Sequence, residues 1–287
     1  MFKIISRRDL APRITEMRVE APRVAAAAMP GQFVIVRVDE EGERIPLTIC
    51  DYDREAGWVT IVTQTVGISS GKINALEEGD SFLDFTGPLG CPSDLVELPD
   101  EELKRTKVLF VAGGVGTAPV YPQAKWLCEH GARPDVIIGA RTKDLFTYVD
   151  EMSQVADVYL ATDDGSAGYH GLVTGLISDL IENRGHHYDR CVVIGPMIMM
   201  KFASQTTARY SLPTMVSLNA LMVDGTGMCG ACRVTVGGQT RFTCVDGPEF
   251  DAHQVDFDLA MRRSAMYRDT EKERDCRCME ELAAGCK

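Results

Sequence analysis

Short runs rich in Val, Ile, Thr and Phe fill the first third of the chain, and turn residues separate them. Pro30-Gly31, Glu41-Gly42 and Gly87-Pro88 are the clearest interruptions. Several short strands at such spacing predict an antiparallel β-barrel or sandwich over residues 1–97. The expected strands are Phe2–Ser6, Ile14–Glu20, Gln32–Val38, Leu47–Asp51, Val59–Val66 and Ser81–Phe85.

From about residue 98 the pattern changes to apolar runs that end in glycine-rich or charged loops. Lys107–Ala112 contains a continuous apolar run, which is typical of a parallel strand buried on both faces. Alternation of such strands with helices predicts a doubly wound α/β domain over residues 98–215, with nucleotide-binding loops at one sheet edge. Further strands are expected at Asp135–Gly139, Asp157–Ala161 and Arg190–Ile194, and helices through Leu127, with Pro119 in the first turn, and at Thr174–Asn183.

The last third begins with a glycine-rich loop that contains cysteines. Arg233–Val236 and Thr240–Thr243 flank Gly237-Gly238 and predict a hairpin, which would bring Cys244 back toward that loop. We expect residues 216–260 to form a small cluster-binding subdomain. Residues 261–287 would form a C-terminal helix and tail, with helix from Leu259 to Asp275.

Composition and charge narrow the class of protein. The chain has 287 residues and a net charge of −12, which argues against nucleic-acid binding. No apolar run is long enough to cross a membrane, and no hydrophobic signal region follows the basic N-terminal residues. We therefore expect a cytoplasmic protein, whose ten cysteines serve as ligands or core residues rather than in disulfides.

Four residues in the glycine-rich loop and after it have the spacing of an iron–sulfur site. Cys229 and Cys232 form a C-x-x-C pair, Asp224 stands five positions earlier, and Cys244 stands twelve later. Plant-type 2Fe–2S proteins have C-x4-C-x2-C and a distant fourth cysteine, so Asp224 takes the place of the first. A structural zinc knuckle or a redox dithiol are the alternatives, although no second close ligand pair for zinc is evident.

Two stretches of the first domain suit a flavin nucleotide. Arg44 and Thr48 would point to the same side of one strand, where the arginine could grip a phosphate and the threonine a ring edge. Ser69 and Ser70 stand at a glycine turn before a short helix, and free N–H groups there could bind an anion. The plainer alternatives are a surface arginine, an ordinary strand threonine and helix capping by a serine.

The α/β domain carries candidate pyridine-nucleotide loops. Gly113–Pro119 follows a strand and opens a helix, which is a phosphate-binding arrangement, although the pattern differs from the Rossmann fingerprint. Asp163 and Asp164 could accept hydrogen bonds from ribose hydroxyls or form an Asx turn. Arg141 and the nearby Lys143 could meet a 2′-phosphate, but the neighbouring acidic residues favour NAD over NADP. The five histidines are scattered, and no catalytic acid or base is expected.

These motifs stand in the order found in the ferredoxin–NADP reductase-like superfamily, and with the cysteine loop behind them the chain resembles its dihydroorotate dehydrogenase electron-transfer branch. It is most similar to the small subunits of NADH-dependent reduced ferredoxin:NADP oxidoreductases, which are electron-bifurcating transhydrogenases. In those subunits one aspartate and three cysteines hold the 2Fe–2S cluster, whereas the dihydroorotate branch has four cysteines. The resemblance covers residues 1 to about 260.

The resemblance implies an FAD barrel, an NAD(H) domain and a 2Fe–2S subdomain. NADH would reduce the flavin, and single electrons would pass through the cluster to a larger flavin and 4Fe–4S partner subunit. The residues implied for FAD are Arg44, Pro46, Leu47, Thr48, Gln64, Val66, Gly67, Ser69 and Ser70. Those implied for the nucleotide are Gly113, Gly114, Gly116, Thr117, Ala118, Pro119, Arg141, Asp163, Asp164, Gly195, Pro196 and Met197.

Two departures and two alternatives accompany the resemblance. Gly67-Ile68-Ser69-Ser70 replaces the usual G-x-G-T turn, and Ile194 stands where many members have a cysteine. The chain could instead serve a dihydroorotate or related dehydrogenase, or be a regulatory module that binds nucleotide and cluster without turnover. Cys276, Cys278 and Cys286 belong either to an exposed tail or to a docking or metal segment.

Overall fold

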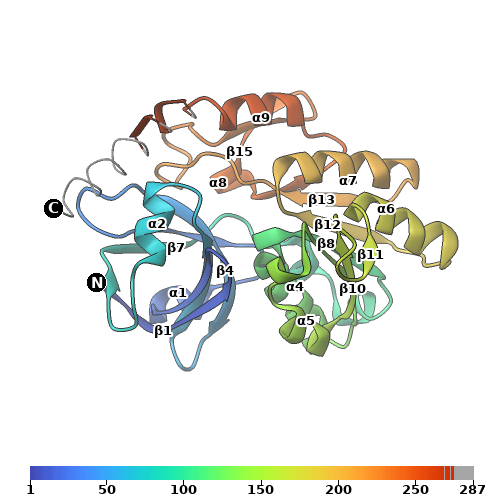
Figure 1. Cartoon of the computed structure of the whole chain (residues 1–287), viewed down its shortest axis with the longest axis horizontal. Coiled ribbons are helices and arrows are strands. Elements are labelled where there is room, and N and C mark those ends of the chain that lie inside the picture. The colour runs from blue at the N-terminus through green and yellow to red at the C-terminus, as the bar shows by residue number, and fades with distance from the viewer. Residues whose placement is uncertain (268, 272, 275–287) are drawn as a thin grey trace.

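The computed structural model describes residues 1–267, 269–271 and 273–274, and residues 2–89 form an antiparallel barrel, the first of two halves of the fold (Figure 1). The strand order is β6-β1-β2-β5-β4-β3-β7, and the Leu83 N–H between the two edge strands donates to the Arg37 carbonyl at 2.9 Å. Ile4, Val34 and Ile61 lie in the fully buried core. The strands are β1 (Phe2–Ala11), β2 (Ile14–Glu20), β3 (Phe33–Arg37), β4 (Ile45–Asp53), β5 (Trp58–Gln64), β6 (Ser81–Phe82) and β7 (Asp84–Leu89).

Every strand predicted for this half is present, but only Ile14–Glu20 has the predicted limits, and β1 runs five residues further than predicted, to Ala11. The strand predicted at Ser81–Phe85 is split into β6 and β7, because Leu83 turns to bond β3. The strand predicted at Val59–Val66 ends at Gln64, where the Thr65 N–H donates to the Arg13 carbonyl. The helices are α1 (Pro22–Ala27) and α2 (Ile68–Asn74), and a 3₁₀ turn (Asp94–Glu97) and α3 (Asp100–Leu103) lead to the second half.

The second half is a seven-stranded sheet in the order β11-β10-β9-β8-β12-β13-β16, parallel except for β16. The chain starts at β8 and winds out to either side, so β8 and β12 mark the switch point of a doubly wound fold. The strands are β8 (Val108–Gly113), β9 (Asp135–Ala140), β10 (Asp157–Thr162), β11 (Tyr169–His170), β12 (Arg190–Ile194), β13 (Thr214–Ser217) and β16 (Glu249–Asp251).

Helices cover both faces of this sheet, because successive strand residues point to opposite sides. Val108 and Phe110 pack with α4 and α5, whereas Leu109 and Val111 pack with α6 and α7. The helices are α4 (Thr117–Glu129), α5 (Val149–Val155), α6 (Val173–Ser178) with a π turn to Asn183, and α7 (Met197–Arg209).

The C-terminal third leaves the sheet after β13 and returns to it at β16. Between them lie the glycine-rich loop, the predicted hairpin of β14 (Arg233–Val236) and β15 (Gln239–Phe242), and α8 (Thr243–Asp246). Because β16 pairs with β13, this region is continuous with the α/β sheet, and the predicted boundary at residue 215 falls within β13. The domain limits otherwise stay predictions.

The chain then forms α9 (Phe257–Ser264), which begins two residues before the predicted helix; a turn at residues 265–267 interrupts the predicted stretch, and the described residues 269–271 and 273–274 are again helical. The Asp256 carboxylate caps it by accepting from the Leu259 N–H at 2.9 Å. Cys276, Cys278 and Cys286 lie outside the described residues. Within the described part of the chain, no helix is long and apolar enough to cross a membrane.

Candidate cofactor sites

Residues 221–232, here called the cluster loop, and α8 bring the four predicted ligands together as two pairs. Cys232 and Cys244 are buried, with their Sγ atoms 3.2 Å apart and no disulfide between them. The Asp224 carboxylate accepts hydrogen bonds from the Thr226 N–H at 2.9 Å and from the Cys229 N–H at 3.0 Å. The predicted hairpin is therefore confirmed, and it returns Cys244 to the cluster loop.

The charges of these side chains follow from their surroundings. The backbone N–H donors of Thr226 and Cys229 hold the pKa of the Asp224 carboxyl below its usual range. Burial, together with the neighbouring Cys232 sulfur, raises the pKa of the Cys244 thiol to about 12. A buried thiol of this kind ionises once a metal is bound, because a coordinated thiol is deprotonated outright.

The arrangement suits a two-iron cluster better than the two alternatives from the sequence. Among the described residues, no three His, Cys, Asp or Glu side chains converge as they would around one zinc ion. The close thiol pair is Cys232 with Cys244, and not the C-x-x-C pair that a redox dithiol of the sequence motif would use. Two ligand pairs fit a 2Fe–2S centre, in which the four protein ligands are divided between two irons.

The cluster loop lies against the barrel. Gly225 has φ +76°, and a Cβ there would lie 2.7 Å from Ile35 Cδ1 and 2.8 Å from Leu89 Cδ1. Only glycine allows this approach without displacing the side chains of β3 and β7. Met222 is buried in the same apolar cluster as Phe33, Ile35 and the two paired cysteines.

The candidate flavin residues of β4 lie beside this loop. Arg44 precedes β4, and its Nε donates to the Val223 carbonyl at 2.9 Å. Thr48 lies opposite Phe33 of β3, and Pro46, Leu47 and Thr48 are half-buried. The strand thus presents a donor, an apolar surface and a hydroxyl on a rigid support.

The second flavin stretch forms a tighter turn than the sequence suggests, because α2 begins at Ile68. The Ser70 hydroxyl accepts from the Val66 and Gly67 N–H groups at 2.9 and 3.0 Å, so it is used inside the turn. The Ser69 hydroxyl donates to the Glu43 carboxylate, an anion at the place where a phosphate is expected. Gln64 and Val66 are exposed next to it.

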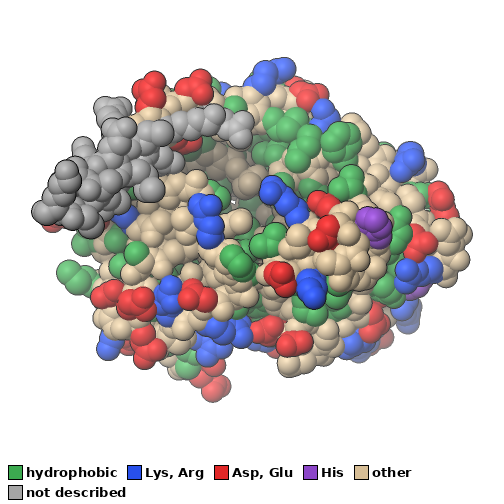
Figure 2. Space-filling model, viewed as in Figure 1, with side chains coloured by type: hydrophobic (Ala, Val, Ile, Leu, Met, Phe, Trp, Pro, Cys, Tyr) green, Lys and Arg blue, Asp and Glu red, His purple; other side chains and the backbone are tan. Residues whose placement is uncertain are grey.

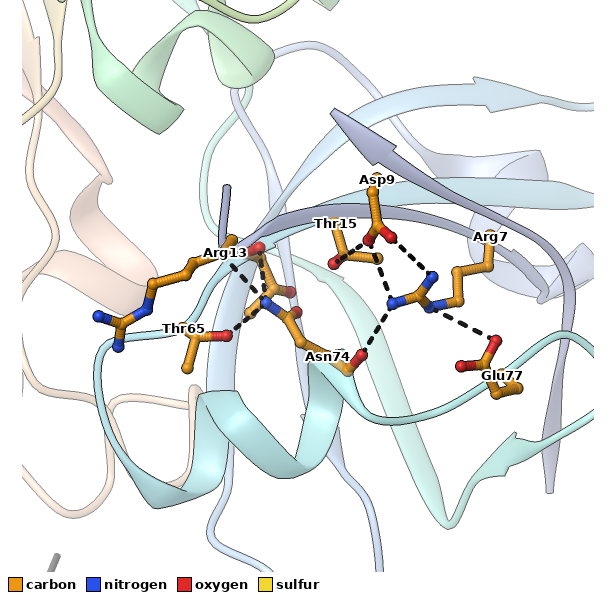
Figure 3. Close-up of polar contacts among 8 residues, drawn as sticks. Arg7, Asp9, Arg13, Thr15, Thr65, Asn74 and Glu77 are labelled. Atoms are coloured by element: carbon orange, nitrogen blue, oxygen red, sulfur yellow. Dashed lines mark hydrogen bonds and ion pairs between the residues drawn. The ribbon is translucent and has the colours of Figure 1, made fainter. Parts of the chain in front are cut away.

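A polar network that the sequence does not reveal fixes the C-terminal end of α2 to the barrel (Figure 3). The Asn74 side-chain amide donates to Thr65 Oγ1 at 2.8 Å and to the carbonyls of Thr63 and Arg13 at 3.3 Å. Arg7 donates to the Asn74 carbonyl at 3.2 Å, where α2 ends. Asn74 thus ties the end of α2 to the residues that precede its first turn.

The nucleotide loops meet at the carboxyl ends of β8 and β12. A Cβ at Gly113 would lie 2.3 Å from Met199 Sδ, and one at Gly116 would lie 2.3 Å from the Ile194 carbonyl oxygen. The glycines therefore allow Gly113–Gly116 to approach Gly195–Met197 closely. Thr117 and Ala118 are fully buried, so these two predicted residues support the turn and do not line an open surface.

The loops after β9 and β10 lie side by side at the same edge. Asp164 Oδ1 accepts from the Ser166 N–H at 2.9 Å, which is the Asx turn that was one alternative. Hydrogen bonds from the Ser166 side chain and then from its backbone lower the pKa of the Asp164 carboxyl. The Lys143 N–H donates to the Ser166 hydroxyl at 2.9 Å. Asp163 and Arg141 are exposed. Figure 2, viewed as in Figure 1, shows a hollow in the middle of the visible face of the molecule, with Lys and Arg side chains at its rim.

The two halves are joined by a polar network, buried at Tyr148 and Glu16 and half-exposed at Arg8, that the sequence does not reveal. Tyr148, at the start of α5 with φ +59°, donates its hydroxyl to the Glu16 carboxylate of β2. Arg8 of β1 donates to Glu16 at 3.0 Å and to Glu151 of α5 at 2.8 Å. Burial, followed by the nearby Cys50 and Glu16, raises the pKa of the Tyr148 hydroxyl, so it remains a donor.

Comparison with known proteins places the chain in a family. Residues 219–256 match the model of the iron–sulfur cluster binding domain of dihydroorotate dehydrogenase B. The chain is 46% identical over 270 residues to a dihydroorotate dehydrogenase B (NAD(+)), electron transfer subunit homolog of Thermotoga maritima, covering 94% of this chain and 93% of that protein. It is 33% identical to the dihydroorotate dehydrogenase B (NAD(+)), electron transfer subunit, of Geobacillus thermodenitrificans, covering 88% and 96%.

A solved structure of the NADH-dependent reduced ferredoxin-NADP oxidoreductase, described for flavin-based electron bifurcation, is similar over 95% of both chains. The sequences are 43% identical, and the TM-score is 0.87. The chain belongs to the family of dihydroorotate dehydrogenase B electron-transfer subunits and their homologues. The predicted ferredoxin reductase-like fold and the predicted electron-transfer role are confirmed.

Proposed function

We propose that this chain is the small, NAD(H)-linked electron-transfer subunit of an electron-bifurcating transhydrogenase that contains FAD and a 2Fe–2S cluster. The observation that carries the proposal is the mixed ligand set. A carboxylate, Asp224, lies beside Cys229, and the cysteine pair Cys232 and Cys244 completes the set. The 43% identity over 95% of a chain of the NADH-dependent reduced ferredoxin-NADP oxidoreductase supports it.

The barrel would hold FAD at β4 and α2. Arg44 and Ser69 offer donors to phosphate, and the half-buried surface of Pro46 and Leu47 suits a flat ring whose edge bonds Thr48. Glu43 would leave the Ser69 hydroxyl when a phosphate binds, since two anions cannot share one donor at that distance. Bound FAD and cluster would supply the step between two-electron nicotinamide chemistry and one-electron transfer.

The α/β half would hold NAD(H) at the switch point between β8 and β12. Gly113 and Gly116 let the turn pack against Gly195–Met197, Gly114 has open space where a Cβ would lie and could let a pyrophosphate approach the backbone, and Asp163 at the next loop suits a ribose hydroxyl. Acidic side chains there disfavour the 2′-phosphate of NADP. Ile194 is buried and cannot transfer protons, so this chain's contribution to hydride transfer is alignment.

A partner subunit would take electrons from the cluster, and the complex would work in the cytoplasm. Leu221, Val223 and Met228 are large apolar residues exposed on the cluster loop, and exposed apolar surface is typical of protein contacts. We propose a larger subunit that carries its own flavin and 4Fe–4S clusters. An electron-transfer subunit needs such a neighbour to deliver or receive electrons.

Anaerobic purification from the native host tests this proposal. We expect a larger iron–sulfur flavoprotein to co-purify, and the complex to couple the oxidation of NADH and of two reduced ferredoxins to the reduction of two NADP, and to run the reverse, bifurcating reaction from NADPH to NAD and ferredoxin. Co-purification of a protein that oxidises dihydroorotate would favour the second candidate function, an electron-transfer subunit of dihydroorotate dehydrogenase. The family-model match at residues 219–256 supports that alternative.

A further inference from the structure

We propose that Arg44 positions the cluster ligand Asp224 in addition to gripping the flavin phosphate. One guanidinium would then connect the two cofactor sites, because it fixes the backbone carbonyl of Val223, the residue before Asp224. The inference rests on the proposed function for the identity of the cofactors. It assigns to this arginine a role that flavin binding alone does not require.

The geometry divides the donors of Arg44 between two tasks. Its Nε donates to the Val223 carbonyl at 2.9 Å, a contact between residues 179 positions apart. A terminal nitrogen lies 3.9 Å from Asp84, which is itself bonded to Arg37 at 2.7 Å. The guanidinium has five N–H donors in a rigid plane, so the Nε bond leaves the terminal nitrogens for a phosphate. About a third of the side chain is exposed, which leaves room for that ligand.

The Val223 carbonyl is one of two supports on either side of Asp224. On the other side, Gly225 packs against Ile35 and Leu89 of the barrel so closely that a Cβ would not fit. Asp224 lies between these supports, and its carboxylate is aimed by the Thr226 and Cys229 N–H groups. The position of Asp224 therefore depends on the barrel, and Arg44 is the polar part of that dependence.

This arrangement couples the two cofactors. A phosphate on the terminal nitrogens restricts the guanidinium and favours its bond to Val223, which holds the cluster loop against the barrel. Because such coupling is reciprocal, FAD stabilises the cluster and the cluster tightens FAD. Lysine cannot replace arginine in this role, since a single ammonium cannot serve a carbonyl and a phosphate in this fixed geometry.

The test compares cluster loss in the wild-type protein, Arg44→Lys and Arg54→Lys, each at saturating FAD. Arg54→Lys is the matched control, because this barrel arginine also donates to a backbone carbonyl, that of Ala28 at 2.9 Å, and belongs to neither cofactor site. The readouts are the rate of iron loss to a chelator and the EPR spectrum of the reduced cluster. We expect Arg44→Lys to lose iron about fivefold faster or more and to show a shifted spectrum. Arg54→Lys should match the wild type.

Equal rates and spectra in Arg44→Lys and wild type would overturn the inference, as would equal acceleration in both variants. Measurement of FAD and of iron plus acid-labile sulfide in the wild type separates this outcome from failure of the proposed function. If the wild type binds neither cofactor, the proposed function fails first. If it binds both and Arg44→Lys changes FAD affinity alone, only the positioning role fails.

Discussion

The Sγ atoms of Cys232 and Cys244 lie 3.2 Å apart in a buried apolar cluster, although twelve residues separate them. The hairpin of β14 and β15 produces this proximity, because its strands run antiparallel and pair Arg233 with Phe242. The two thiols remain free at a separation longer than a disulfide bond. Two buried thiols this close could together bind a metal centre, with Asp224 and Cys229 of the cluster loop on its other side.

Cys232→Ser should therefore remove the cluster without unfolding the chain. Serine occupies almost the same volume, but its hydroxyl is a poor ligand for iron. We expect iron and acid-labile sulfide to fall about tenfold or more, because even outer-shell changes cost 10–100-fold in metal affinity. Cys91→Ser is the control, since Cys91 is exposed and bonds the Val245 carbonyl near the loop. Loss of iron in both variants would point to general instability of this region.

The return of Cys244 to the cluster loop was the part of the candidate site most open to prediction from the sequence, while its role as a ligand stays a prediction. The spacing of the candidate ligands is local, and a turn at Gly237-Gly238 suffices to return Cys244 to the loop. The limits of β2 and the strand–glycine–helix unit at β8 are equally local features. In contrast, the bond between Tyr148 and Glu16 joins residues 132 apart and depends on how the two halves pack. No pattern within either segment carries that information.

Tyr148→Phe tests this connection between the halves. The substitution removes the hydroxyl that donates to the buried Glu16 carboxylate and keeps the ring. We expect the free energy of unfolding to fall by about 1–3 kcal/mol, the usual cost of losing a hydrogen bond to a charged group. Denaturant titration measures it. Tyr121→Phe is the control, because that ring lies 5.4 Å from Tyr148 and its loss of a hydroxyl leaves the Glu16 contact in place.

Glu249 of β16 predicts a dependence of stability on pH. Burial raises the pKa of this carboxyl to about 7, and the nearby Asp94, paired with Arg190 at 2.6 Å, adds to the shift. Hydrogen bonds to Ser93 and to Gln123, whose Nε2 donates to Oε1 at 2.6 Å, oppose it. The other carboxyl oxygen is buried without a hydrogen-bond partner in the described structure.

The direction in which stability changes with pH follows from proton linkage. In the folded chain Glu249 keeps its proton up to a higher pH than in the unfolded chain, so stability falls as pH rises from about 4.5 to 7 and then levels off. Glu249→Gln removes this dependence, and the free energy of unfolding of the wild type should fall by about 3 kcal/mol relative to the variant across that interval. Thermal unfolding at several pH values measures it, with Glu101→Gln as an exposed control. Parallel curves for wild type and Glu249→Gln would contradict the expectation.

Asn74→Ala tests whether the network behind α2 supports flavin binding. The variant loses the amide that ties the end of α2 to Thr65 and to the carbonyls of Thr63 and Arg13, so the turn that carries Ser69 would be less fixed. We expect FAD affinity to fall about tenfold, which corresponds to about 1.4 kcal/mol, while iron content stays unchanged. Calorimetric titration with FAD measures the affinity. Arg13→Ala serves as the control, because it removes an exposed side chain and keeps the accepting carbonyl. If Asn74→Ala lowers the melting temperature but binds FAD as tightly as wild type, the network stabilises the barrel without positioning the flavin turn.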